Sequence, residues 1–184
     1  MFGSSWGSVL EACRLGAEWA WRQVYEDVAP SLLRYHRARG TADPDDVVGD
    51  TFVRAVRGLS GFDGGEGEFR AWLFSISRNR AADLARAASR RAERPAHLEE
   101  LVVAGGMGDV EDDAVRALAE ERIRDVLDEL TPDQRDVLLL RLLEDLTIEQ
   151  IAGVIRKSPG AVKALQARGL EQIRRKISSG AVTL

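Results

Sequence analysis

Basic side chains near the end of the chain follow a helical spacing that suits DNA binding. At 100° per residue, the segment 159–177 turns one set of residues outward: Gly160, Lys163, Ala164, Ala167, Arg168, Glu171, Arg174 and Arg175. Lys163 and Arg168 can reach base edges or phosphates, and the small residues let a helix approach a major groove closely. We expect Arg174 and Arg175 to hold phosphates, which position a helix without reading sequence.

The residues ahead of this face predict the structure that presents it. Thr147 with Gln150 forms a capping box for a short helix. After a turn at 156–157, Ser158 caps a second helix whose first residue is Pro159. Two short helices around a tight turn, the second one basic, predict a helix-turn-helix that binds duplex DNA. The alternative is an amphipathic helix that packs on a protein partner.

Aromatic residues gather in the middle of the chain, beside a glycine-rich stretch at 58–69. Phe62, Phe69, Trp72 and Phe74 lie within thirteen residues and precede an arginine-rich segment. Rings beside a basic groove are typical of single-strand binding, because bases stack on rings while arginines follow the backbone. The alternative is that the rings belong to the core, which we favour for Phe69 and Phe74.

The charge of the chain is segregated. Residues 70–94 carry a net charge of +5 and residues 156–176 carry +6, although the whole chain of 184 residues carries −4. Two basic segments in an acidic chain indicate contact with nucleic acid at two places. Two solvated helix faces are the alternative.

Hydrophobic spacing is helical throughout, which predicts an all-α protein. Asp43 and Pro44 begin one helix, whose expected buried face consists of Val48, Phe52, Ala55, Val56 and Leu59. A further helix is expected from about Phe69 to Arg91. Residues 95–114 hold six acidic residues, no Lys or Arg, and several glycines. We therefore predict two small helical domains, 1–92 and 114–184, joined by a flexible acidic linker at 93–113.

The sequence argues against several other functions. One cysteine, Cys13, and two histidines are too few for a disulfide framework or a structural zinc site, so neither metal nor cofactor is expected. The sequence contains neither a cluster of His, Cys and carboxylate residues nor a glycine motif that would hold a phosphate, so we expect no enzymatic activity. No apolar run is long enough to span a bilayer, and the amino terminus lacks a signal-peptide pattern. We expect a cytoplasmic protein without membrane insertion.

Two segments resemble a known family. One segment consists of DDVVGDTFVRAVRGL at 45–59 followed by FRAWLFSISRNRAADLAR at 69–86. It resembles the second conserved domain of bacterial sigma factors of the extracytoplasmic-function (ECF) group, which belongs to the sigma-70 family. Their fourth domain is similar to LTPDQRDVLLLRLLEDLTIEQIAGVIRKSPGAVKALQARGLEQIRRKI at 130–177. The resemblance covers roughly 16–92 and 115–177, in the family's order and spacing.

This resemblance implies a subunit that binds core RNA polymerase and opens promoter DNA. The polymerase clamp would bind Asp46, Asp50, Arg54 and Arg57, and the flap would bind the leucine-rich helices of the fourth domain. The single-stranded −10 element would contact Phe62, Asp63, Phe69, Trp72, Asn79, Arg80 and Arg86. The duplex −35 element would contact Ser158, Lys163, Ala164, Ala167 and Arg168, with Arg174 and Arg175 on phosphates. An anti-sigma protein is a further expected partner.

A conventional helix-turn-helix regulator is the competing hypothesis. It would bind duplex DNA alone and would not need polymerase. A sigma factor is instead expected to bind promoters poorly when free, because its two DNA-reading domains gain their spacing on polymerase.

Overall fold

The computed structural model describes residues 2–92 and 126–178, and every regular element in these ranges is a helix. The helices are η1 (Gly3–Ser5), α1 (Trp6–Arg14), α2 (Glu18–Ala38), α3 (Pro44–Gly58), η2 (Leu59–Gly61), α4 (Glu66–Ala92), α6 (Pro132–Glu144), α7 (Ile148–Ile155) and α8 (Pro159–Ser178). The prediction of an all-α fold is confirmed. The expected linker at 93–113 lies outside the described residues.

Local capping signals begin the helices where the sequence predicts. The Asp43 side chain accepts a hydrogen bond from the Asp46 backbone N–H at 2.9 Å, ahead of Pro44. Thr131 and Thr147 each form a capping box with the glutamine three residues later. Helix α4 differs from its prediction, because it begins at Glu66 rather than near Phe69. The glycine-rich stretch is therefore shorter as a loop than expected.

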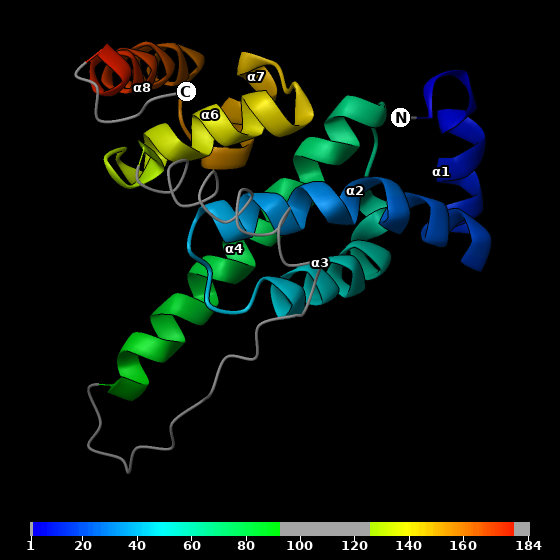
Figure 1. Ribbon diagram of the computed structural model, residues 1–184. Coiled ribbons are helices and arrows are strands. Elements are labelled where there is room, and N and C mark those ends of the chain that lie inside the picture. Colours follow the sequence, from blue (N-terminus) through cyan, green and yellow to red (C-terminus); the bar gives the residue numbers. More distant parts are fainter. Residues whose placement is uncertain (1, 93–125, 179–184) are drawn as a thin grey trace, which may run out of the picture.

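The long helix α4 is the centre of the arrangement, with α2 and α3 packed along it and α6 and α7 lying over its first half (Figure 1). Helix α8 packs on α6 and α7. We refer to η1 through α4 as the amino-terminal half and to α6 through α8 as the carboxyl-terminal half.

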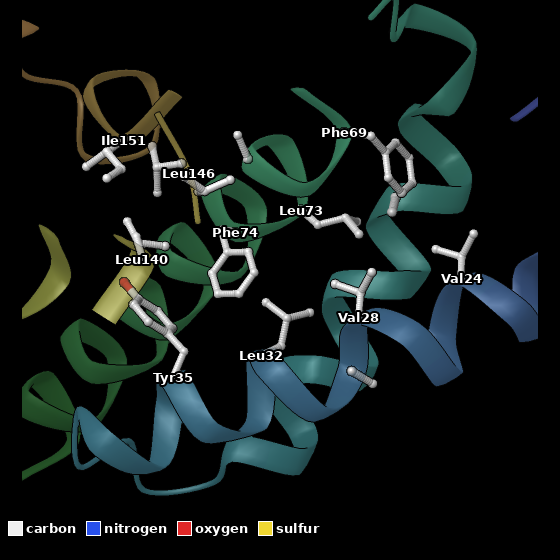
Figure 2. Packing of buried hydrophobic residues seen from close by; sticks show 14 of the residues in the cluster. Val24, Val28, Leu32, Tyr35, Phe69, Leu73, Phe74, Leu140, Leu146 and Ile151 are labelled. Carbon is white, nitrogen blue, oxygen red and sulfur yellow. The ribbon is translucent and has the colours of Figure 1, made fainter. Parts of the chain in front are cut away.

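The two halves share one hydrophobic core. Figure 2 shows Leu32 and Tyr35 of α2 and Phe74 of α4 facing Leu140 and Leu146 of the other half. All five side chains are fully buried. Burial of apolar surface between the halves therefore adds to the stability of the described fold.

One predicted core residue of α3 is wrong. The sequence places Val56 on the buried face, but it is 53% exposed, whereas Val47 on the other flank of that face is fully buried. The hydrophobic stripe of α3 is rotated toward Val47 and Thr51. Helical spacing alone could not choose between the two flanks.

Candidate nucleic-acid interface

The helix-turn-helix at 147–178 is built by local signals. Helix α7 ends at Ile155, the following residue Arg156 has a left-handed backbone with a φ of 55°, and the chain turns before Ser158. The Ser158 hydroxyl accepts a hydrogen bond from the Ala161 backbone N–H at 3.2 Å, so it caps α8 as predicted. Val162 at the start of α8 is fully buried.

Close packing against α6 fixes the orientation of α8. Gly169 is buried, and a Cβ atom at this position would lie 3.0 Å from Leu138 Cδ1 and 3.5 Å from Gln134 Cβ. The absence of a side chain lets the two helices approach closely. The opposite face of α8 is thereby held outward.

That outward face carries the residues predicted to contact duplex DNA. All of them are exposed: Ser158, Lys163, Ala164, Ala167, Arg168, Arg174 and Arg175. Arg168 donates to the Ala164 carbonyl of its own helix at 3.2 Å, and Arg175 lies 3.6 Å from Glu171. Lys176 differs from these residues, because its ammonium lies 2.6 Å from a Glu129 carboxylate oxygen and its side chain is largely buried.

The aromatic residues of the amino-terminal half pack on one another. The Phe69 ring lies 4.9 Å from Trp6, 5.3 Å from Phe62 and 5.6 Å from Trp72, measured between centroids, and its residue is 1% exposed. Phe62 and Trp72 are half-buried, with centroids 5.2 Å apart. Phe69, like Phe74, therefore belongs to the core, and Phe62 and Trp72 are the accessible rings of this cluster.

The amino-terminal residues hold the loop that leads into α4. Both carboxylate oxygens of Glu66 accept backbone N–H bonds, from Phe2 at 2.9 Å and Gly3 at 3.0 Å. The Trp6 indole donates to the Gly64 carbonyl at 3.4 Å, and Arg14 donates to the Phe62 carbonyl at 2.8 Å. Sequence reasoning missed this role of residues 2–14, because the bonded partners are 48 to 64 positions apart.

Residues expected at two different sites are in contact. Arg80, expected on the single-strand path, lies with its Nε 2.5 Å from Asp50 Oδ2 and its Nη2 3.7 Å from Asp46 Oδ2. Both aspartates are expected to face the polymerase clamp. Arg54 and Arg57 are exposed on the same helix as these aspartates.

The remaining expected residues have different surroundings. Asp63 is exposed in the loop before α4, and Asn79 is half-buried. Arg86 is exposed and pairs with Asp83 one turn earlier. The residues expected at the −10 element thus lie along one stretch from 62 to 86, but the structure does not bring all of them to one exposed surface.

Two buried groups have shifted pKa values. Burial, together with the nearby Arg39 guanidinium, lowers the pKa of His36 to about 4. Its ring nitrogens contact the hydroxyls of Thr41 and Ser77. Burial raises the pKa of the Cys13 thiol to about 11, which keeps it protonated and unreactive at neutral pH.

Within the described residues, no group of three or more His, Cys, Asp or Glu side chains is arranged to hold a metal ion. None of the helices described is both long enough and apolar enough to cross a membrane.

Comparison with known proteins identifies the two halves separately. The family model for sigma-70 region 2 matches residues 22–91, and the model for sigma-70 region 4 matches residues 120–173. The ECF RNA polymerase sigma factor SigD of Mycobacterium tuberculosis is 30% identical over 183 residues, which cover 96% of this chain and 86% of SigD. BldN of Streptomyces coelicolor, also an ECF RNA polymerase sigma factor, is 30% identical over 176 residues. That match covers 91% of this chain and 64% of BldN.

A solved structure shows the same arrangement of helices. CnrH in complex with the cytosolic domain of CnrY superposes with a TM-score of 0.68 at 26% sequence identity. The match covers 93% of this chain and 96% of CnrH.

Proposed function

Because the chain belongs to the ECF sigma factors of the sigma-70 family, we propose that it binds core RNA polymerase, recognises −35 and −10 promoter elements and promotes DNA melting. The observation that carries this proposal is the presence of both matched regions in one chain, with an exposed basic face on α8. A sigma factor needs both regions, whereas a conventional regulator needs only a helix-turn-helix. The proposed role is non-enzymatic and cytoplasmic.

Recognition of the duplex −35 element is assigned to α8. Lys163 and Arg168 reach base edges or phosphates, and Ala164 and Ala167 let the helix enter the major groove and contact thymine methyl groups. Ser158, Arg174 and Arg175 bind phosphates at the two ends of the helix.

Capture of the single-stranded −10 element is assigned to the loop before α4 and to the exposed side of this helix. Phe62 and Trp72 offer ring faces on which bases stack, a contact that contributes about 1–3 kcal/mol per base. Phe69 supports these rings from the core, and Asp63, Asn79, Arg80 and Arg86 line the strand path. This stacking offsets part of the cost of unpairing the duplex.

Binding to the polymerase clamp is assigned to α3, and binding to the flap to the leucine-rich helices of the carboxyl-terminal half. Asp46, Arg54 and Arg57 are exposed on α3, Asp50 is half-buried beside Arg80, and the exposed Val53 and Val56 add apolar surface between them. We include an inhibitory protein of the anti-sigma kind among the partners, since CnrH was solved bound to a second protein domain.

Reconstituted transcription tests this function. Bacterial core polymerase is incubated with genomic fragments, with and without the protein, and transcript starts are mapped. We expect starts that need the protein and share two spaced upstream elements. The absence of such starts, with binding to duplex DNA but none to core polymerase, would instead establish a conventional helix-turn-helix regulator.

Variants then separate the assigned sites on the promoters so identified. Lys163→Ala with Arg168→Ala should weaken binding to the upstream element. Trp72→Ala should leave binding to core polymerase unchanged and reduce open-complex formation, measured by permanganate reactivity of unpaired thymines. Unchanged open complexes in Trp72→Ala would remove this residue from the single-strand path.

A further inference from the structure

The loop at 62–65, between η2 and α4, receives hydrogen bonds from the start of the chain. Its two ends are tied by backbone bonds of 3.0 Å, one from the Phe62 N–H into η2 and one from the Phe69 N–H to the Gly65 carbonyl. The carbonyls of Phe62 and Gly64 accept instead from side chains of α1. Helix α1 thus fixes the loop between its two tied ends.

The backbone that α1 holds also supports a ring proposed to stack on an unpaired base. A Cβ atom at Gly64 would lie 3.0 Å from Phe62 Cζ, so the Phe62 ring rests directly against the Gly64 backbone. Gly64 and Gly65 are consecutive, and glycine has more backbone freedom than any other residue. The position of the Phe62 ring therefore depends on the contacts that hold this loop.

The bond from Arg14 contributes little to the packing of α1 itself. That packing comes from the apolar face of the helix, where Trp6, Leu10 and Cys13 are buried. Arg14 is exposed, yet its Nη2 donates to the Phe62 carbonyl at 2.8 Å. An exposed hydrogen bond of this kind adds little to stability, but it fixes the position of the carbonyl that accepts it.

Glu66 holds the other end of the loop, at the first residue of α4. Its two carboxylate oxygens accept the backbone N–H groups of Phe2 at 2.9 Å and Gly3 at 3.0 Å, and its side chain is 14% exposed. Arg70 of the same helix lies 3.6 Å from this carboxylate. Glu66 is therefore engaged by the amino-terminal segment and by its own helix.

We propose that Trp6, Arg14 and Glu66 are positioning residues for the −10 element, which hold the loop so that the Phe62 ring is presented to an unpaired base. A loop already held in its binding conformation loses less conformational entropy when the strand binds. Trp6 and Arg14 lie outside the segment 22–91 that the region 2 model matches. The link to the −10 element rests on the function proposed above, whereas the holding of the loop does not.

Backbone NMR relaxation of the full chain alone tests whether the loop is held. In the wild type, the amides of Gly64 and Gly65 should have order parameters of about 0.85, the value of rigid backbone. Arg14→Met keeps the apolar stem but removes the donors, and it should lower these order parameters toward about 0.6. Glu66→Gln replaces one acceptor oxygen with an amide group and should have the same effect from the other end of the loop.

Arg22→Met is the matched control for Arg14→Met. Arg22 is also exposed, but its partner Glu18 lies in the same helix, α2, at 2.7 Å. The control variant removes an arginine and an ion pair without removing a bond to the loop, so the loop should stay rigid. A mobile loop in the wild type, or a rigid loop in both Arg14→Met and Glu66→Gln, would overturn the proposal.

Binding of a single strand to the reconstituted holoenzyme tests the positioning role. The probe is a fluorescent oligonucleotide that carries the non-template −10 sequence of a mapped promoter. Apparent affinity falls with the fraction of molecules whose loop is held, so the loss of one hydrogen bond in Arg14→Met should weaken strand binding by about two- to tenfold. Affinities for core polymerase and for the upstream duplex should not change, and Arg22→Met should match the wild type throughout.

A double variant shows whether Arg14 acts through Phe62. Phe62→Ala removes the ring, so adding Arg14→Met should weaken strand binding no further. An equally large effect of Arg14→Met in both backgrounds, or wild-type strand affinity in a variant whose loop is mobile, would remove the positioning role. If Arg14→Met frees the loop but the wild-type holoenzyme does not bind the strand, the held loop stands and the proposed function fails.

Discussion

The two surfaces proposed to read DNA differ in how they relate to the core beneath them. On α8, the reading residues stand outside the packing, which Val162 and Gly169 provide from the opposite face. In the amino-terminal half, the rings of Phe62 and Trp72 pack against Phe69, which is itself core. The DNA-facing side chains of α8 project from a helix that is packed without them, whereas the aromatic rings also contribute to the packing of the amino-terminal half.

This difference matches the two forms of DNA. A duplex has a fixed groove, so a rigid helix with projecting side chains can bind it without rearrangement. An unpaired base must be stacked and enclosed, which requires rings that can exchange a protein neighbour for a base. Substitution of the buried Phe69 should therefore affect folding and function together, whereas substitutions on α8 should separate them.

The largest effect is expected at Phe69. Phe69→Ala removes a fully buried ring from the aromatic cluster and should lower the free energy of unfolding by about 3–5 kcal/mol. Urea denaturation followed by circular dichroism measures this change. Phe69→Leu keeps most of the apolar volume and should cost less. A loss below about 1 kcal/mol in Phe69→Ala would show that the cluster is not a core.

Acid should destabilise the amino-terminal half through His36. Its folded pKa of about 4 lies below the ordinary value near 6.5, so the unfolded chain binds the proton more tightly. Stability should therefore fall as the pH drops from about 6.5 toward 4, by at most about 3 kcal/mol. The difference in unfolding free energy between wild type and His36→Gln, measured from pH 7 to pH 4, isolates this loss. A difference that does not vary with pH would exclude the buried neutral imidazole.

A change on the packed side of α8 should destabilise the carboxyl-terminal half moderately. Gly169→Val forces a branched side chain against Leu138 and Gln134 and should cost about 1–3 kcal/mol. Gly153→Ala is the matched control in α7, where a Cβ atom meets nothing within 4 Å, and it should raise stability by up to about 1 kcal/mol. Thermal unfolding of both variants tests whether α8 depends on this close approach.

The smallest change in stability is expected on the outward face of the same helix. Lys163→Ala with Arg168→Ala should alter the unfolding free energy by less than about 0.5 kcal/mol. The salt dependence of duplex binding should meanwhile become shallower, by about 0.9 in logarithmic slope for each phosphate that the double variant no longer neutralises. A double variant destabilised by more than about 1 kcal/mol would remove the contrast between the two surfaces.

Local features of the fold were predictable, because their signals lie within a few residues. Four capping side chains each accept a hydrogen bond from the backbone N–H three residues later: Asp43, Thr131, Thr147 and Ser158. The start of each of these helices can therefore be predicted from the local sequence. The outward face of α8 followed from the same helical spacing.

Contacts between distant segments were not predictable from such signals. Arg70 and Arg78 lie in a basic segment that indicates DNA contact, yet carboxylates of the other half neutralise them. The bond from Tyr35 to Asp136 joins residues 101 positions apart. Periodicity predicts that a face is buried, but not which element covers it, and the same ambiguity explains the error at Val56.

The shared core also bears on how the chain folds during synthesis. Tyr35 emerges from the ribosome 101 residues before Asp136, an interval of about 5–20 s at about 5–20 residues per second. Through that interval α6 is not yet available to cover the side of α2 on which it later packs. Nascent molecules thus present a transient apolar surface, to which chaperones at the translating ribosome can bind first.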